Sequence, residues 1–152
     1  MAKLIAARSA QYVMEAEFVF NFDDTIVPVS GGTPIVGTNE VDFGKTNILA
    51  TVVPAIQLPQ GAVIVGGSLT TETAFDTASY TVSVGDSGNA ARYLAAADRK
   101  AAATVALLTP GYRSEGENLT MTITNADVCT AGKATLRVLF ITTGRANESV
   151  PN

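Results

Sequence analysis

The stretch YVMEAEFVFNF, residues 12–22, constrains the fold more than any other part of the chain, because its side chains alternate with a period of two. One face carries six apolar side chains, namely Tyr12, Met14, Ala16, Phe18, Phe20 and Phe22. The other face carries Val13, Glu15, Glu17, Val19 and Asn21. This alternation is typical of a half-buried antiparallel strand. A long strand with an aromatic face needs a large facing sheet, and the pattern therefore predicts two packed layers.

Strand patterns recur along the rest of the chain, in segments 47–61, 62–75, 79–84, 117–124 and 133–142. In the first of these, Pro54 and Pro59 remove backbone donors, so we expect an edge strand or a bend. The pair Gly66-Gly67 predicts a bulge or a corner in the second. The last segment is apolar on both faces from Val138 to Ile141, so it is either central in its sheet or covered by a partner chain.

The alanine-rich segment NAARYLAAADRKAAATVALL, residues 89–108, interrupts these patterns. Alanine favours helix, and we expect one short helix or an ordered loop there. The whole pattern predicts an all-β, single-domain antiparallel β-sandwich (jelly roll) of about seven or eight strands. We expect an N-terminal arm at 1–11, the sandwich at 12–143 and a C-terminal tail at 144–152.

The composition favours a subunit of an assembly. Only 16% of the residues are charged, below the roughly 25% of ordinary domains, so we expect another protein to cover part of the surface. The ten cations lie singly apart from Arg99-Lys100, which argues against nucleic-acid binding. The lone Cys129 excludes an intrachain disulfide, and no apolar run is long enough for a membrane span.

The tetrapeptide GDSG, Gly85-Asp86-Ser87-Gly88, matches the sequence around the nucleophilic serine of chymotrypsin-type proteases. A serine nucleophile of that kind needs a histidine base, and the chain contains no histidine. A Ser-Lys dyad is the remaining alternative, but none of the four lysines forms a recognisable motif with Ser87. We therefore interpret GDSG as a turn, in which Asp86 and Ser87 bond nearby amides and both glycines take positive φ. The sequence predicts no enzyme and no catalytic residue.

The other searches for a site also favour structural roles. With one cysteine and no histidine, a structural zinc site is excluded. We interpret Asp23-Asp24, Glu40 and Asp42 as solvated turn carboxylates rather than calcium ligands. No glycine-rich phosphate cradle is present, and we expect no cofactor and no metal. The stripe Phe18, Phe20 and Phe22 is expected in the core rather than in a sugar site.

Residues 58–110 resemble small virion proteins of tailed bacteriophages. The motifs are Gly66-Gly67 in an apolar strand, Phe75 in the next, a strand that ends in Val84-Gly85-Asp86, and Arg92-Tyr93-Leu94 before an alanine-rich segment. The subgroup that the chain looks most like is the capsid cement (decoration) proteins with a jelly-roll fold, including those of podophages such as a Bordetella phage.

The resemblance implies a structural virion protein that binds the outside of a phage capsid and bridges major capsid protein subunits. It implies self-association as a homodimer or homotrimer, synthesis in the host cytoplasm, and no nucleic-acid or membrane partner. We expect the two arms and the loop 23–46 to contact the capsid or sister subunits. Arg92 and Tyr93 are expected to make contacts within the chain, Arg92 through a carboxylate or carbonyls, with an intersubunit contact as the alternative. A tail, baseplate or head-fibre subunit, or a carbohydrate-binding module for host adsorption, is the alternative function.

Overall fold

The computed structural model describes residues 12–26, 29–30, 33–34, 41–44 and 48–142. Strands account for the regular structure of this part of the chain. In chain order they are β1 (Met14–Asn21), β2 (Thr25–Ile26), β3 (Val29–Ser30), β4 (Thr33–Pro34), β5 (Val41–Asp42), β6 (Ile48–Gln57), β7 (Ala62–Thr73), β8 (Tyr80–Asp86), β9 (Asn89–Asp98), β10 (Ala103–Ala106), β11 (Asn118–Asn125) and β12 (Lys133–Thr142). No helix in these residues is long and apolar enough to cross a membrane.

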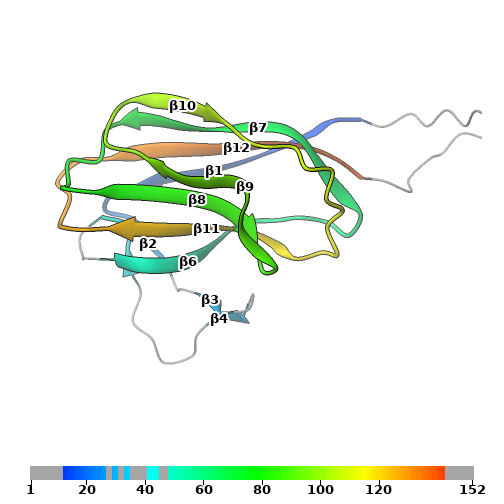
Figure 1. Ribbon diagram of the computed structural model, residues 1–152, viewed down its shortest axis with the longest axis horizontal. Coiled ribbons are helices and arrows are strands. Elements are labelled where there is room, and N and C mark those ends of the chain that lie inside the picture. The colour runs from blue at the N-terminus through cyan, green and yellow to red at the C-terminus, as the bar shows by residue number, and fades with distance from the viewer. Residues whose placement is uncertain (1–11, 27–28, 31–32, 35–40, 45–47, 143–152) are drawn as a thin grey trace, which may run out of the picture.

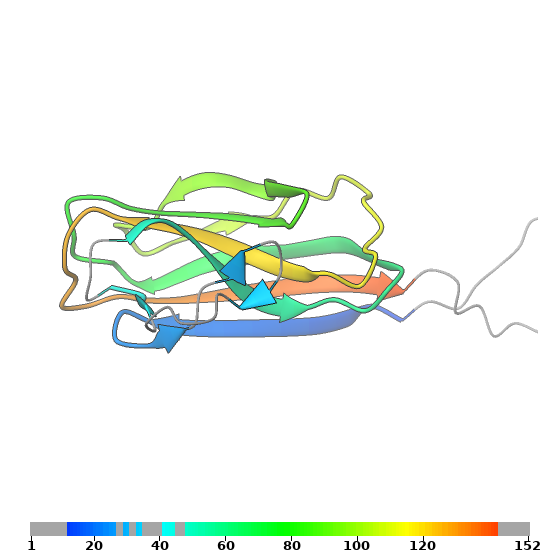
Figure 2. The same cartoon turned by 90° about the horizontal axis from the view of Figure 1, so that it is seen from below.

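Two four-stranded antiparallel sheets form the described body of the molecule (Figure 1). The first sheet has the order β1-β12-β7-β10, and the second has the order β6-β11-β8-β9. The short strands pair separately, β2 with β5 and β3 with β4. Seen from below, the two sheets face each other across the core (Figure 2). Consecutive main strands mostly alternate between the sheets, as in an eight-stranded jelly roll, so the predicted fold class is confirmed.

Strand β1 follows the predicted alternation and lies at an edge of the first sheet. Its pairing with β12 runs without a register shift from Met14–Phe140 to Asn21–Lys133. Phe20 is fully buried, and Phe18 packs half-buried against the core, so their assignment to the core is confirmed. Tyr12 and Met14 share the aromatic face in the sequence pattern, yet they are exposed. At the start of an edge strand, neighbours cover a side chain from one side only.

Aromatic rings continue from β1 into the centre of the molecule. The ring centroids of Phe20 and Phe43 are 5.1 Å apart, and those of Phe20 and Phe75 are 5.9 Å apart. Phe75 stacks on Tyr80 at 3.8 Å, and the Tyr80 hydroxyl donates a hydrogen bond of 2.9 Å to the carbonyl oxygen of Phe43. The strands β8 and β11 add fully buried aliphatic side chains to this core, namely Val82, Val84, Leu119, Met121 and Ile123.

Three predictions about strand positions are confirmed. Strand β6, which contains Pro54, is one of the two edge strands of the second sheet. Strand β12, whose residues Val138 to Ile141 are apolar on both faces, lies between β1 and β7 and is therefore central in its sheet. The register between β7 and β12 shifts next to Gly66, so that Val65 forms a bulge.

The prediction of a short helix or loop in the alanine-rich segment is wrong. This segment forms strands β9 and β10, with only residues 99–102 between them. Val82 pairs with Ala97 in the second sheet, and Leu69 pairs with Val105 in the first. Pairing with strands distant in sequence overrides the weak preference of alanine for helix.

Candidate functional site

Ser87 lies in a two-residue turn between β8 and β9, as predicted. Its neighbour Asp86 is buried, and one carboxylate oxygen of Asp86 accepts hydrogen bonds of 2.9 Å from the backbone N–H groups of Gly88 and Asn89. Ser87 itself is exposed at the tip. The acidic residue of the GDSG sequence therefore organises the turn, and the interpretation of GDSG as a turn is confirmed.

Gly85 is required in this hairpin for a reason that differs from the predicted one. Neither Gly85 nor Gly88 has a positive φ. A Cβ atom on Gly85 would instead lie 2.0 Å from the carbonyl oxygen of Asn89 and 2.4 Å from the carbonyl carbon of Ala90. Asp86 pairs with Asn89 and Val84 pairs with Leu94, so Gly85 alone faces the bulged segment 90–93. The backbone of the bulged segment therefore occupies the space that a side chain at position 85 would need.

Arg92 ties the hairpin to a loop that is distant in the sequence. Its guanidinium forms an ion pair with Asp86 and lies 3.8 Å above the centre of the Tyr112 ring. The hydrogen bond to Asp86 raises the pKa of Arg92 above its usual range. The predicted contact of Arg92 with a carboxylate within the chain is thus confirmed. Sequence reasoning missed Tyr112, because no local pattern indicates which aromatic ring a distant cation will meet.

Tyr93 follows Arg92 and is almost fully buried. Its carbonyl oxygen accepts a hydrogen bond of 2.7 Å from the backbone N–H of Leu108. Burial, and secondly the Asp86 carboxylate, raise the pKa of Tyr93 to about 12. Both Arg92 and Tyr93 therefore serve contacts within the chain.

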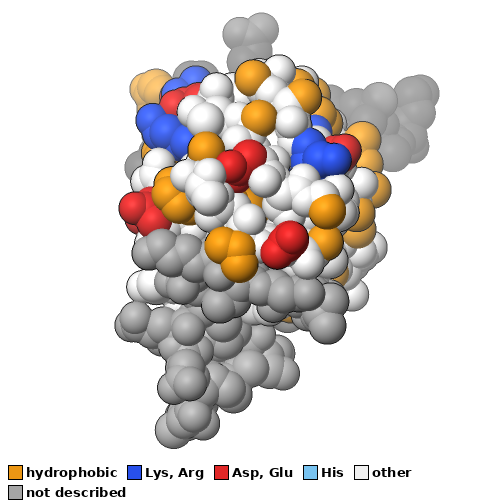
Figure 3. Space-filling model, turned by 90° about the vertical axis from the view of Figure 1, so that its left-hand side faces the viewer, with side chains coloured by type: hydrophobic (Ala, Val, Ile, Leu, Met, Phe, Trp, Pro, Cys, Tyr) orange, Lys and Arg blue, Asp and Glu red, His pale blue; other side chains and the backbone are white. Residues whose placement is uncertain are grey.

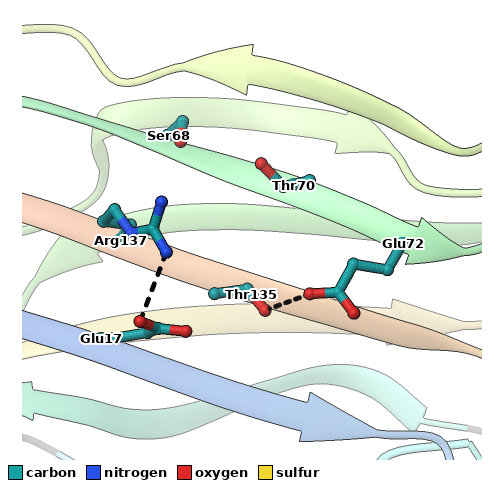
Figure 4. Close-up of a pocket in the computed structure, with 6 residues that line it drawn as sticks. All are labelled: Glu17, Ser68, Thr70, Glu72, Thr135 and Arg137. Carbon is teal, nitrogen blue, oxygen red and sulfur yellow. Dashed lines mark hydrogen bonds and ion pairs between the residues drawn. The ribbon is translucent and has the colours of Figure 1, made fainter.

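The outer face of the first sheet carries a network of charges (Figure 4). Arg137 on β12 lies 2.7 Å from a carboxylate oxygen of Glu15 and 3.4 Å from one of Glu17. On the same face Glu72 accepts a hydrogen bond of 2.8 Å from Thr135 and pairs with Lys133 at 2.7 Å. Both contacts lower the pKa of Glu72, and the hydrogen bond from Lys133 has the larger effect. The cations of this face are thus engaged by carboxylates of the same chain.

A hollow lies among these polar groups, lined by Glu17, Ser68, Thr70, Glu72, Thr135 and Arg137 (Figure 4). Its volume is about 150 Å³. Small-molecule pockets are roughly 300–1,000 Å³ and mostly apolar, so this hollow is a poor candidate for a ligand site.

The outer face of the second sheet has a different chemistry. Its side chains on β8 and β11 are hydroxyls, namely Thr81, Ser83, Thr120, Thr122 and Thr124. Leu119, Met121 and Ile123 alternate with these threonines and point into the core. We call this row of five residues the hydroxyl face. Ser83 and Thr120 are buried within the chain, whereas the other three are half-buried. None of the five is charged, so another protein can cover the half-buried threonines without the desolvation of ions on this row.

The turns at one end of the sandwich are joined by polar contacts. Asp76 accepts hydrogen bonds from the backbone N–H groups of Thr130 and Ala131. The pKa of Asp76 is lowered, first by a hydrogen bond from the Thr130 hydroxyl and then by these two backbone contacts. Cys129 is buried, and burial raises the pKa of its thiol. Charged side chains of both signs are scattered over the coloured part of this end (Figure 3). No His, Cys, Asp and Glu cluster suited to a metal is found among the described residues.

Arg99 is a second residue that sequence reasoning missed. It is only 4% exposed, and its Nε and one terminal nitrogen have no hydrogen-bond acceptor among the described residues. Desolvation lowers the pKa of this guanidinium.

The parts of the chain that were predicted to contact other proteins are described only in part. The arms 1–11 and 144–152 lie outside the described residues, as does Glu40. Within the loop 23–46, the described pieces form the two short pairs β2–β5 and β3–β4. Asp23 and Asp24 line a hollow of about 430 Å³ beside Phe18, Val19 and Phe43.

Comparisons with known proteins show what this fold is similar to. No family model matches the chain, and no curated protein matches it. Among solved structures, a chain of the cyanophage Pam1 capsid asymmetric unit matches with a TM-score of 0.55 and 20% identity, over 93% of this chain and 94% of that chain. A chain of the capsid of Ralstonia phage GP4 matches with a TM-score of 0.52 and 13% identity, over 93% and 91%.

A third match comes from the acid-stable capsid structure of Helicobacter pylori bacteriophage KHP30, with a TM-score of 0.51, 18% identity and coverage of 87% and 93%. At these identities the likeness concerns the fold. It extends over nearly the whole length of each chain, so the sandwich is shared as a unit.

Proposed function

We propose that this chain is a structural protein of a phage head, without catalytic activity, and that it binds the outside of the capsid as a cement protein. The observation that carries the proposal is the fold: an eight-stranded jelly roll that is similar, over almost its full length, to chains in three phage capsid structures. In this role the protein bridges major capsid protein subunits and associates with itself as a homodimer or homotrimer. It needs no cofactor, nucleic acid or membrane.

The surface chemistry supports a role in an assembly. Few residues are charged, and the charges on the first sheet are paired with one another. The hydroxyl face of the second sheet has no such pairs to break. Many modest contacts, repeated by the symmetry of a shell, give strong total binding without a deep pocket. We therefore propose that the accessible end of the hydroxyl face, formed by the paired residues Thr81 and Thr124, lies against the shell.

The test is reconstitution with phage heads that lack the protein. Added protein is expected to co-sediment with heads at a fixed ratio to the major capsid protein, and to raise the temperature at which heads rupture. A lysine at Thr124, on the hydroxyl face, is expected to weaken this binding. The matched control is Thr104→Lys on the exposed strand β10 of the first sheet, which should bind as the unmodified protein does.

Three results would contradict the proposal. Binding to tails, baseplates or fibres instead of heads would indicate that the protein belongs to another part of the virion. Specific binding to a glycan array, with head stability unaffected by the protein, would favour a carbohydrate-binding module. Equal loss of binding in both lysine variants would refute the assignment to the hydroxyl face.

A further inference from the structure

The edges of the two main sheets differ in how well they are protected from pairing with another chain. In the described sheets, β10 has only four residues, β9 contains two register shifts, and β6 contains Pro54. Short strands, bulges and prolines are the usual means of blocking a sheet edge. Strand β1 has none of these three: it has eight residues, no proline and an unbroken register with β12. Its two charged side chains, Glu15 and Glu17, are engaged by Arg137 on the outer face of the sheet. Figure 2 shows β1, in blue, along the lower margin of the sandwich.

Exposed apolar side chains gather on the same strand. Seven large hydrophobic residues are exposed in the described part of the chain, and four of them belong to β1 or directly precede it: Tyr12, Val13, Met14 and Val19. Tyr12 is 84% exposed and Val19 is 45% exposed. Scattered apolar residues on a surface are ordinary, whereas a concentration along one unprotected strand indicates an interaction surface.

The far end of β1 opens into the 430 Å³ hollow, which combines apolar and acidic walls. Phe18, Val19 and Phe43 supply the apolar wall, and Asp23 and Asp24 supply the carboxylates. Asp24 accepts a hydrogen bond of 2.7 Å from the backbone N–H of Asn21. No described Lys or Arg pairs with either carboxylate. The hollow is therefore complementary to an extended apolar segment that carries a cation.

The chain itself contains such a segment at residues 1–11, MAKLIAARSAQ. It has Lys3 and Arg8, no acidic residue, and a small apolar run between them. Residues 12–44, in contrast, contain six carboxylates and no Lys or Arg. We propose that residues 1–11 of a second copy pair with the edge of β1 and place a cation in this hollow. A reciprocal exchange of this kind gives a two-fold dimer.

A second copy is favoured over the same chain by the direction of β1. Residue 12 lies at the end of β1 opposite to the hollow, roughly 27 Å away for eight residues of strand. To reach the hollow, the same chain would need a tight reversal within Ser9-Ala10-Gln11-Tyr12. This stretch contains no Gly, Pro, Asn or Asp, the residues that tight turns favour. The inference deepens the self-association within the proposed function, and it is tested without capsids.

The experiment measures the dimer dissociation constant of the purified full-length protein by sedimentation. The charge reversals Lys3→Glu/Arg8→Glu on the arm, and separately Asp23→Lys in the hollow, are each expected to weaken dimerisation by about tenfold or more. Mixing the two variants should restore dimers of near-normal affinity, because each supplies the partner charge that the other lacks. Val19→Lys should weaken the dimer as well. The matched control is Leu108→Lys, at an exposed site just after β10, which is the strand at the opposite edge of the first sheet.

Each alternative outcome overturns the inference. A monomer at all concentrations shows that no second copy binds. Dimers unaffected by the reversals show that another surface joins the copies. Variants that stay monomeric but lose thermal stability show that the arm binds its own chain. Dimers that behave as expected but fail to bind heads would refute the proposed function and leave this inference standing.

Discussion

Gly85 has no room for a side chain, because the bulged segment 90–93 passes directly over it. We predict that Gly85→Val lowers the free energy of unfolding by about 3 kcal/mol, since overpacking must displace the hairpin backbone. Ser87→Ala, two residues away on the exposed tip, should change it by less than about 0.5 kcal/mol. Urea unfolding of the two variants measures both effects. A Gly85→Val protein as stable as the original would contradict the close approach of Asn89 and Ala90.

Ionisation of Tyr93 makes the free energy of unfolding depend on pH in the alkaline range. Its pKa is raised to about 12 in the fold, whereas an exposed tyrosine in the unfolded chain ionises near 10. Below pH 10 both states keep the proton and the contribution of Tyr93 is complete. As the pH rises from 10 to about 12, the unfolded chain loses the proton first, so stability falls.

The phenylalanine variant Tyr93→Phe isolates this effect, because it keeps the ring and removes the proton. The difference in unfolding free energy between the two proteins should be constant below pH 10 and change between pH 10 and 12 in favour of the variant. Parallel curves through this window would show that Tyr93 is not buried as described. Tyr80, whose pKa burial also raises, titrates in both proteins and cancels in the difference.

At the scale of elements, Arg92 joins the β8–β9 hairpin to the loop that contains Tyr112. We predict that Arg92→Ala leaves the Asp86 carboxylate without its cation, lowers Tm, and raises amide hydrogen exchange in residues 86–94 and 107–113. Arg92→Lys should recover part of the loss through charge, but not the flat contact with the ring. Exchange that rises equally near Thr130, at the other end of the sandwich, would show general destabilisation instead of release of this contact.

Some of the strands could be predicted from the sequence and others could not. Alternation is local, so the strands β1, β8 and β11 and the edge position of β6 could be predicted from their own residues. The strand character of residues 89–98 could not, because it arises from pairing with Val82 and Val84 on β8. The sequence predicts a glycine-dependent turn at position 85. It does not predict the reason, because the bulge that excludes a side chain there belongs to the neighbouring strand β9. The Arg92–Tyr112 contact and the hydroxyl face likewise depend on how distant segments meet.

For the molecule as a whole, Cys129 is a natural reporter of unfolding. It is the chain's single cysteine and is 2% exposed. We predict that a thiol reagent labels the native protein at pH 8 more than about a hundredfold more slowly than the urea-unfolded chain, because reaction requires opening of the fold. The labelling rate should increase in Gly85→Val, by about tenfold for each 1.4 kcal/mol of stability that the variant loses. Native labelling at the rate of an unfolded chain would contradict the packing around this residue.

Strand β12 closes the first sheet last, because it lies between β1 and β7 although it follows every other strand in the sequence. The sheet is therefore incomplete until nearly the whole chain has been made. A sandwich with this topology depends on contacts between its first and last strands, and few of its tertiary contacts are local.

The same pairing decides how the molecule responds to a pulling force. Met14 and Phe140 face each other at one end of the β1–β12 pair, and β1 has no other neighbour in the described sheet. A load applied between residues 12 and 142 opens this pair like a zipper, one hydrogen-bonded rung at a time, instead of shearing all rungs together. In optical tweezers with handles at these two sites, β1 should detach at low force. A handle pair at residues 12 and 133 would load the same rungs along the strands and should hold to much higher force. The sandwich is therefore mechanically weak when a load separates these two paired ends, and stronger when the load runs along the strands.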